Sequence, residues 1–185
     1  WKNKGGTEEE KIIRDMAVFS AFGEGLQLFA SFVMLLNFTR FGKMKGMGQI
    51  VAWSIRDESH HVESMIKLLH AVLDEMPHVW NDDFKATLYQ ICRDMVGLED
   101  KFIDLAFGMG PVEGLNPGEV KQYIRHIADR RLLQLGLKPN YGVKDNPLEW
   151  VDWIVGGVEH TNFFENRATE YAKGTLTGTW DEAFN

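Results

Sequence analysis

The sequence predicts an all-α protein. Long stretches without proline carry apolar residues every three or four positions, which is the period of a helix with one buried face. We find no stretch with the two-residue alternation of a half-buried strand. Glycines and prolines cluster in turns between the helical stretches, around residues 39–46, 108–118 and 135–146. At 185 residues and 44% hydrophobic content, the chain can form one domain with a packed core.

The first predicted helix is one continuous element over about residues 8–38. Thr7 and Glu10 have the spacing of a capping box at its start, and no proline follows before the turn. Glu24 lies on a stripe whose other members are uncharged. They are Ala17, Ser20, Ala21, Leu28 and Ser31. A carboxylate on such a face needs compensation, so we expect a cation near Glu24.

The remaining helices follow in order. They are predicted over about residues 47–75, 81–107, 117–134 and 146–154. The segment 160–173 has helical character with weak periodicity. We therefore expect a helical domain over residues 1–173 and a flexible tail, polar and rich in Gly and Thr, over 174–185.

The inner faces of the second and third helices are predicted from their apolar stripes. In the second helix the stripe comprises Val51, Ser54, Glu58, His61, Met65, Leu68 (or Leu69) and Val72. In the third helix it comprises Leu88, Ile91, Met95, Leu98 and Phe102. The polar pair Glu58 and His61 is thus expected inside an otherwise apolar face.

The spacing of Glu58 and His61 indicates a metal site. Residues three apart leave the same face of a helix, and a carboxylate with an imidazole can bind a transition metal together. Two Glu-x-x-His helices and one carboxylate from each of two further helices form the dinuclear site of ferritin-like bundles. Glu24 lies about as far before the turn at 39–46 as Glu58 lies after it, so both are expected at similar depth. The three residues would supply half of such a site.

Less specific interpretations compete with a metal site. A single Glu-x-x-His occurs by chance, and Glu75 and His78 have the same spacing across Pro77, which destroys the helical geometry. Glu24, Glu58 and His61 could instead form an internal Glu–His hydrogen bond without a metal, as in a non-catalytic bundle where Glu24 and His61 only hydrogen-bond.

Neighbouring polar residues receive other interpretations. Asp57 is best explained as an acid that orients a nearby metal-binding residue, and His60 as a surface or interface residue. Arg130 and Arg131 are expected to be solvated, and Cys92 to belong to the core.

Composition indicates which partners and which cellular location to expect for the protein. A net charge of −7 argues against nucleic acid or an anionic membrane as partner. One cysteine and a polar start without a secretory signal fit the cytoplasm. The most apolar run, residues 26–38, is too short to span a bilayer. The chain opens without Met and soon enters a helix, as though it began within a longer protein.

Four stretches resemble the class I ribonucleotide reductase small subunit. Ala21–Phe32 (AFGEGLQLFASF) and Ile55–His61 (IRDESHH) are similar to the metal motifs of its second half. Asn146–Trp150 (NPLEW) and Asn162–Tyr171 (NFFENRATEY) are similar to its late segments. The resemblance covers nearly the whole chain.

The resemblance implies a ferritin-like helical homodimer with a dinuclear iron centre, or a manganese–iron or dimanganese one. Such a centre reacts with dioxygen and generates a radical, which passes to a separate large subunit that reduces ribonucleotides to deoxyribonucleotides. By motif position, Glu24, Glu58 and His61 correspond to metal ligands.

The resemblance also implies roles for residues around the metals. Asp57 matches the acid on the radical relay, while Leu28, Phe32 and Ser54 match the pocket wall. Tyr171 matches the tyrosine that hands the radical on, and the tail would dock on the large subunit.

The departures from the family pattern predict a missing half. The family's further carboxylate, first Glu-x-x-His and radical tyrosine lie upstream of these motifs and do not occur here. We expect the N-terminal half to come from the same or a separate polypeptide. The alternatives are another di-metal carboxylate oxidase or monooxygenase, or a non-catalytic helical bundle.

Overall fold

The computed structural model describes residues 6–156, and within that range it contains helices and no strands. The elements are α1 (Glu8–Ala17), the π-helix η1 (Val18–Glu24), α2 (Phe29–Arg40), α3 (Lys45–Glu75), the 3₁₀ turn η2 (Pro77–Val79), α4 (Asp82–Gly108), α5 (Pro117–Gln134) and α6 (Glu149–Gly156). The predicted all-α class is confirmed for this part of the chain.

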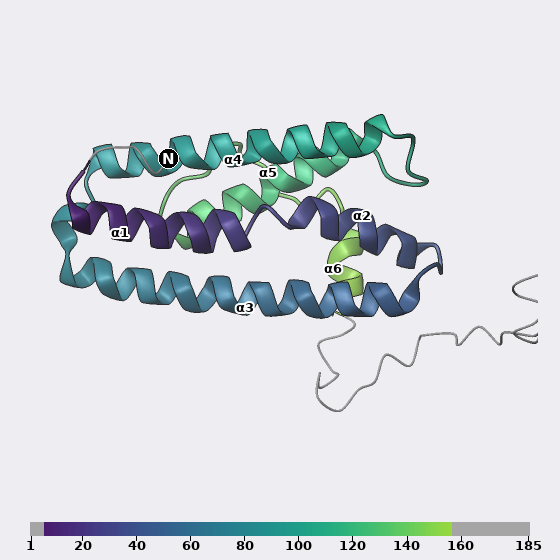
Figure 1. The fold of residues 1–185 in the computed structure, drawn as a ribbon, viewed down its shortest axis with the longest axis horizontal. Helices are drawn as coiled ribbons and strands as arrows, with labels where there is room; N and C mark the ends of the chain where they lie inside the picture. Colours follow the sequence, from purple (N-terminus) through teal and green to yellow (C-terminus); the bar gives the residue numbers. More distant parts are fainter. Residues whose placement is uncertain (1–5, 157–185) are drawn as a thin grey trace, which may run out of the picture.

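The first helical line, α1–η1–α2, lies between two long helices (Figure 1). The helix α3 runs back along it on one side, and α4 lies along the other side with α5 packed against it. The short α6 contacts both α2 and α3. The core therefore forms where α3, α4 and α5 meet the first helical line.

Helix starts follow the predicted capping chemistry. Thr7 Oγ1 accepts a hydrogen bond from the Glu10 backbone N–H at 3.2 Å, and Glu10 Oε2 accepts one from the Thr7 N–H at 2.9 Å. The predicted capping box is thus confirmed. Asn81 caps α4 in the same way, because its Oδ1 accepts from the Phe84 N–H at 2.9 Å.

The prediction of one continuous helix over residues 8–38 is wrong. From Val18 the backbone widens into a π-helix, with Gly25 N–H donating to Ser20 O at 3.1 Å and Gln27 N–H to Phe22 O at 3.2 Å. A short turn then precedes α2. The local sequence lacks proline, but Gly23 and Gly25 flank Glu24 where the π-helix ends, and glycine weakens a helix interior.

The buried face of α3 is rotated from the predicted one. The buried residues are Gly46, Gly48, Val51, Ala52, Ile55, Val62, Ile66, Leu69 and Leu73. Of the predicted stripe, Ser54, Glu58, Met65 and Val72 are half-buried, while His61 and Leu68 are exposed. Apolar residues occupy two adjacent faces of this helix, and in residues 6–156 only one of these faces is covered by other helices.

The same correction applies to α4. Leu88 and Ile91 are buried as predicted, and Met95 is half-buried. Leu98 and Phe102, however, are exposed, since the C-terminal part of this face meets no helix within the described range.

Cys92 is buried in the core, as the sequence predicts, and burial raises the pKa of its thiol to about 12.

The stretch Glu8–Arg40 is long and apolar enough to cross a membrane by length and composition alone, unlike the shorter run at 26–38. In the fold, 50% of its most apolar window is buried against other helices, so core packing accounts for much of its apolar character.

The segment 160–173, Tyr171 and the tail at 174–185 lie outside the described residues. The domain boundary at 173 stays a prediction.

Adjacent leucines of α3 provide a test of the observed packing. Leu69 is fully buried and Leu68 is 50% exposed. We expect Leu69→Ala to lower the free energy of unfolding by roughly 2–5 kcal/mol, because it leaves a cavity. Leu68→Ala should change it by about 0.5 kcal/mol or less. Urea denaturation of both variants makes the comparison, and equal losses would contradict the packing of α3.

Candidate metal centre

Three predicted site residues meet between η1 and α3. Glu24 ends η1, while Glu58 and His61 lie one turn apart on α3. One potential ligand atom from each lies within 4.8 Å of the others. The two glutamates are half-buried and His61 is 53% exposed. The antiparallel packing of α3 along η1 therefore brings together the two carboxylates and the imidazole that the sequence singled out.

The Glu58 and His61 side chains form no internal hydrogen bond. His61 Nδ1 lies 3.8 Å from Glu58 Oε2, beyond hydrogen-bond distance. For Glu58 and His61, the metal-free interpretation therefore lacks its expected hydrogen bond.

Asp57 lies beside His61 without a hydrogen bond to it. Its Oδ1 is 3.8 Å from His61 Nε2, and its side chain is 73% exposed. The predicted role of Asp57, to orient a metal-binding residue, is thus not realised through His61 within the described residues. A partner on another segment would be needed.

The predicted wall residues include two that lie close in sequence to the candidate ligands, Leu28 four residues after Glu24 and Ser54 four residues before Glu58. Leu28 is exposed, while Phe32 and Ser54 are half-buried. Phe32 stacks edge-on against Phe29, with ring centroids 5.9 Å apart. The Ser54 hydroxyl donates to Ile50 O at 3.1 Å, so it is used by its own helix. Phe19 is also exposed, about one π-turn before Glu24.

Two buried charged residues meet the break that follows Glu24. Arg131 of α5 is 7% exposed, so the expectation that it is solvated is wrong, whereas Arg130 is exposed as predicted. The Arg131 Nε donates to Gly25 O at 2.9 Å. Glu99 of α4 is 5% exposed and faces the Ala30 backbone N–H, which partly offsets the effect of burial on its pKa, while its Oε2 has no hydrogen-bond partner among the described residues. Both residues fall on faces packed against η1 or α2, a contact that depends on tertiary packing and has no local sequence signal.

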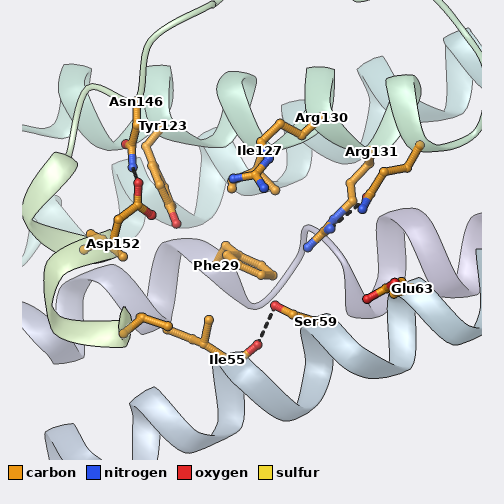
Figure 2. A pocket seen from close by; sticks show the side chains of 13 residues that line it. Phe29, Ile55, Ser59, Glu63, Tyr123, Ile127, Arg130, Arg131, Asn146 and Asp152 are labelled. Atoms are coloured by element: carbon orange, nitrogen blue, oxygen red, sulfur yellow. Dashed lines mark hydrogen bonds between the residues drawn. The ribbon is translucent and has the colours of Figure 1, made fainter. Parts of the chain in front are cut away.

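A cavity of about 270 Å³ lies next to this break, between α2, α3, α5 and α6 (Figure 2). Phe29 and Ile55 form part of its apolar lining, and Arg131 and Tyr123 are among its polar residues. Burial raises the pKa of the Tyr123 phenol far above its usual range. None of the three candidate ligands lines this cavity. The cavity is therefore separate from the trio.

Comparison with known proteins identifies the family. A family model described as "Ribonucleotide reductase, small chain" matches residues 1–147, which include Glu24, Glu58 and His61. The chain belongs to the ribonucleotide reductase small-chain family. Tyr171 lies beyond the matched range.

Sequence relatives support the assignment to the small-chain family. The chain is 51% identical over 175 residues to the probable ribonucleoside-diphosphate reductase small subunit 048L of Invertebrate iridescent virus 3, covering 94% of this chain and 46% of the relative. It is 34% identical over 161 residues to the ribonucleoside-diphosphate reductase subunit beta of Chlamydia pneumoniae, covering 87% and 46%. The chain thus spans about half the length of the curated relatives it matches.

Solved structures of small-chain proteins share the fold. A putative class I ribonucleotide reductase from Bacillus halodurans matches with a TM-score of 0.73 and 25% identity, over 77% of this chain and 45% of that one. The ribonucleotide reductase R2 subunit from Clostridium botulinum matches with a TM-score of 0.70 and 24% identity, over 78% and 44%. The predicted ferritin-like helical fold is confirmed.

Burial of Glu99 predicts a pH-dependent stability. Burial raises the pKa of this carboxyl from 4.5 to about 7. Between these values the folded state keeps a proton that the unfolded state releases, so raising the pH favours unfolding. We expect the contribution of Glu99 to the free energy of unfolding to fall as pH rises from about 4.5 to about 7. The free energy of unfolding of Glu99→Gln should lack this pH-dependent contribution.

Urea denaturation of the metal-free chain across that pH range makes the comparison. The difference between the wild type and Glu99→Gln isolates the single carboxyl, because other titrating groups are common to both. Parallel stability curves for the two proteins would show that Glu99 titrates normally.

Proposed function

We propose that this chain is the C-terminal half of the radical-generating small subunit of ribonucleoside-diphosphate reductase. In this proposal Glu24, Glu58 and His61 bind metal in a dinuclear centre. The observation that supports it most is the convergence of the three ligand atoms within 4.8 Å, from two separate helical segments. Membership of the small-chain family supports the reductase assignment over an unrelated oxidase, monooxygenase or non-catalytic bundle.

The donor set fits the proposed metals. Carboxylate oxygens and an imidazole nitrogen accept iron and manganese alike, so a dinuclear iron centre, a manganese–iron one and a dimanganese one all remain compatible. A ferritin-like dinuclear site uses two Glu-x-x-His pairs and two further carboxylates. The trio supplies one such pair and one carboxylate, so the other half of the donor set must come from the proposed N-terminal half of the small subunit.

The open face beside the trio supports this missing partner. Phe19 and Leu28 are exposed on either side of Glu24 in the sequence, and Ile50 and Leu68 are exposed on α3. Exposed apolar side chains around a polar centre are typical of an interface. Packing of the N-terminal half on this face, from the same or a separate chain, would bury them and complete the donor set.

The bound metals would supply the redox chemistry for activating dioxygen and generating a radical. The residues of this chain would hold and shield them. The side chains of Glu24, Glu58 and His61 provide the ligand atoms, while Leu28, Phe32 and Ser54 form a wall that limits water access. Asp57 would orient an imidazole contributed by the other half and take part in the radical relay, since its exposed carboxylate is free to meet one.

Further partners belong to the same proposal. The small subunit would form a homodimer, Tyr171 would relay the radical, and residues 174–185 would dock on the large subunit, where deoxyribonucleotides form. The single cysteine supports a cytoplasmic location, and the net charge of −7 supports the absence of nucleic-acid and anionic-membrane partners.

Adjacent histidines on α3 offer a matched test of the metal ligands. His61 belongs to the trio, whereas His60 is exposed and lies one position around the helix. We expect His61→Ala to weaken Mn²⁺ binding by at least about 100-fold, because losing a ligand should cost no less than losing the residue that orients one. His60→Ala should bind like the wild type.

The test uses calorimetric titration of the chain assembled with a recombinant first half of the iridescent virus relative. Circular dichroism checks that each variant folds. If His60→Ala and His61→Ala bound Mn²⁺ equally well, His61 would not be a ligand.

A further inference from the structure

We propose that Arg131, together with Glu99, is a positioning residue of the metal centre. Arg131 is hydrogen-bonded to the backbone at the start of the helix break that follows Glu24, and the buried Glu99 faces the backbone at its end. The inference rests on the proposed metal site and adds residues that act on it from α5 and α4.

The break leaves backbone groups without helical partners. The π-helix ends at Glu24 and α2 begins at Phe29, so the last carbonyls of one element and the first amides of the next face each other across a short turn. Within the turn, Phe29 N–H donates to Leu26 O at 3.1 Å. Gly25 O instead accepts a hydrogen bond from Arg131 of another helix, α5.

Arg131 contacts both sides of the break. Its Nε donates to Gly25 O at 2.9 Å, and its guanidinium lies over the Phe29 ring at 5.5 Å from the centroid. Gln134 Oε1 accepts from Arg131 Nη1 at 2.9 Å and fixes the far side of the guanidinium. Figure 2 shows Arg131 reaching from α5 toward Phe29 and the turn. Burial lowers its pKa to about 10, so it stays charged at neutral pH.

Glu99 meets the other end of the break. The Ala30 N–H that it faces belongs to the first turn of α2, whose dipole favours the charged form of an acid, although burial has the larger effect on the pKa of Glu99. The cation of Arg131 meets the carbonyl end of η1, which the dipole makes negative. The two side chains therefore match the polarity of both ends of the break.

The contact of Arg131 is close to the ligand itself. It holds the carbonyl of Gly25, the residue next to Glu24, where a Cβ would overlap Ala21 O and lie 2.8 Å from Arg131 Nε. At Gly23, on the other side of Glu24, a Cβ would meet only Val18 O at 3.7 Å. The approach of α5 to the backbone at Gly25 thus fixes the direction in which the chain leaves Glu24.

The neighbouring arginines make a matched pair of variants. Arg131→Met keeps the aliphatic stem and removes the hydrogen bond to Gly25, while Arg130→Met alters the exposed neighbour. We expect Arg131→Met to raise amide hydrogen exchange in peptides covering residues 25–32 of the metal-free chain by about 10-fold or more. In the chain assembled with the family's first half, Mn²⁺ affinity should fall by about 10-fold. Arg130→Met should leave both measurements unchanged.

A second pair covers the case in which Arg131→Met does not fold. Gly25→Ala pushes against Arg131 and the Ala21 carbonyl, whereas Gly23→Ala adds the same methyl group in ordinary contact. We expect Gly25→Ala to raise exchange in residues 25–32 and to weaken Mn²⁺ binding, and Gly23→Ala to do neither. Arg131→Lys, which keeps a charged donor, should recover part of the affinity lost in Arg131→Met.

Two results would overturn the positioning role. One is wild-type Mn²⁺ affinity in Arg131→Met, and the other is faster exchange with unchanged affinity, which would leave the contact purely structural. Failure of the proposed function has a different signature, because the wild-type assembly itself would then bind no Mn²⁺. The exchange comparison in the metal-free chain would still report whether Arg131 holds the break.

Discussion

The antiparallel packing of α3 against the first helical line is the constraint on which the candidate metal centre depends. Glu24 ends a π-helix, while Glu58 and His61 lie one turn apart on a regular α-helix, and only their packing brings the three ligand atoms within 4.8 Å. The cost of placing two carboxylates near each other is offset when a cation binds between them. The chemistry of the three side chains and the packing that brings them together therefore both support a metal site.

The open side of the trio and the length of the relatives have one physical explanation. The chain spans about half of the small subunits it matches, and the ligands it supplies are half of a dinuclear donor set. Exposed apolar residues such as Phe19 and Leu28 lie on either side of Glu24 in the sequence and do not belong to the core. A second set of helices on this face would account for both features.

Much of this arrangement can be predicted from the sequence, because it depends on local periodicity. The Glu58–His61 spacing and the position of Glu24 before the turn were sufficient to predict that the three residues converge. The break after Glu24 could not be predicted in this way, since its tertiary contacts come from Arg131, which is hydrogen-bonded to Gly25, and from Glu99, both on distant helices. The buried face of α3 was misplaced for a related reason. Two of its faces are apolar, and periodicity alone does not tell which one is covered by the described helices.

Native mass spectrometry of the assembled halves, prepared anaerobically with Fe²⁺, tests the central claim most directly. The account predicts a particle that contains this chain and a first half bearing the other Glu-x-x-His, with two metal ions for each pair of halves. This chain alone should not retain two ions. A correctly folded pair of halves that retains no metal would contradict the assignment of Glu24, Glu58 and His61 as half of a dinuclear centre.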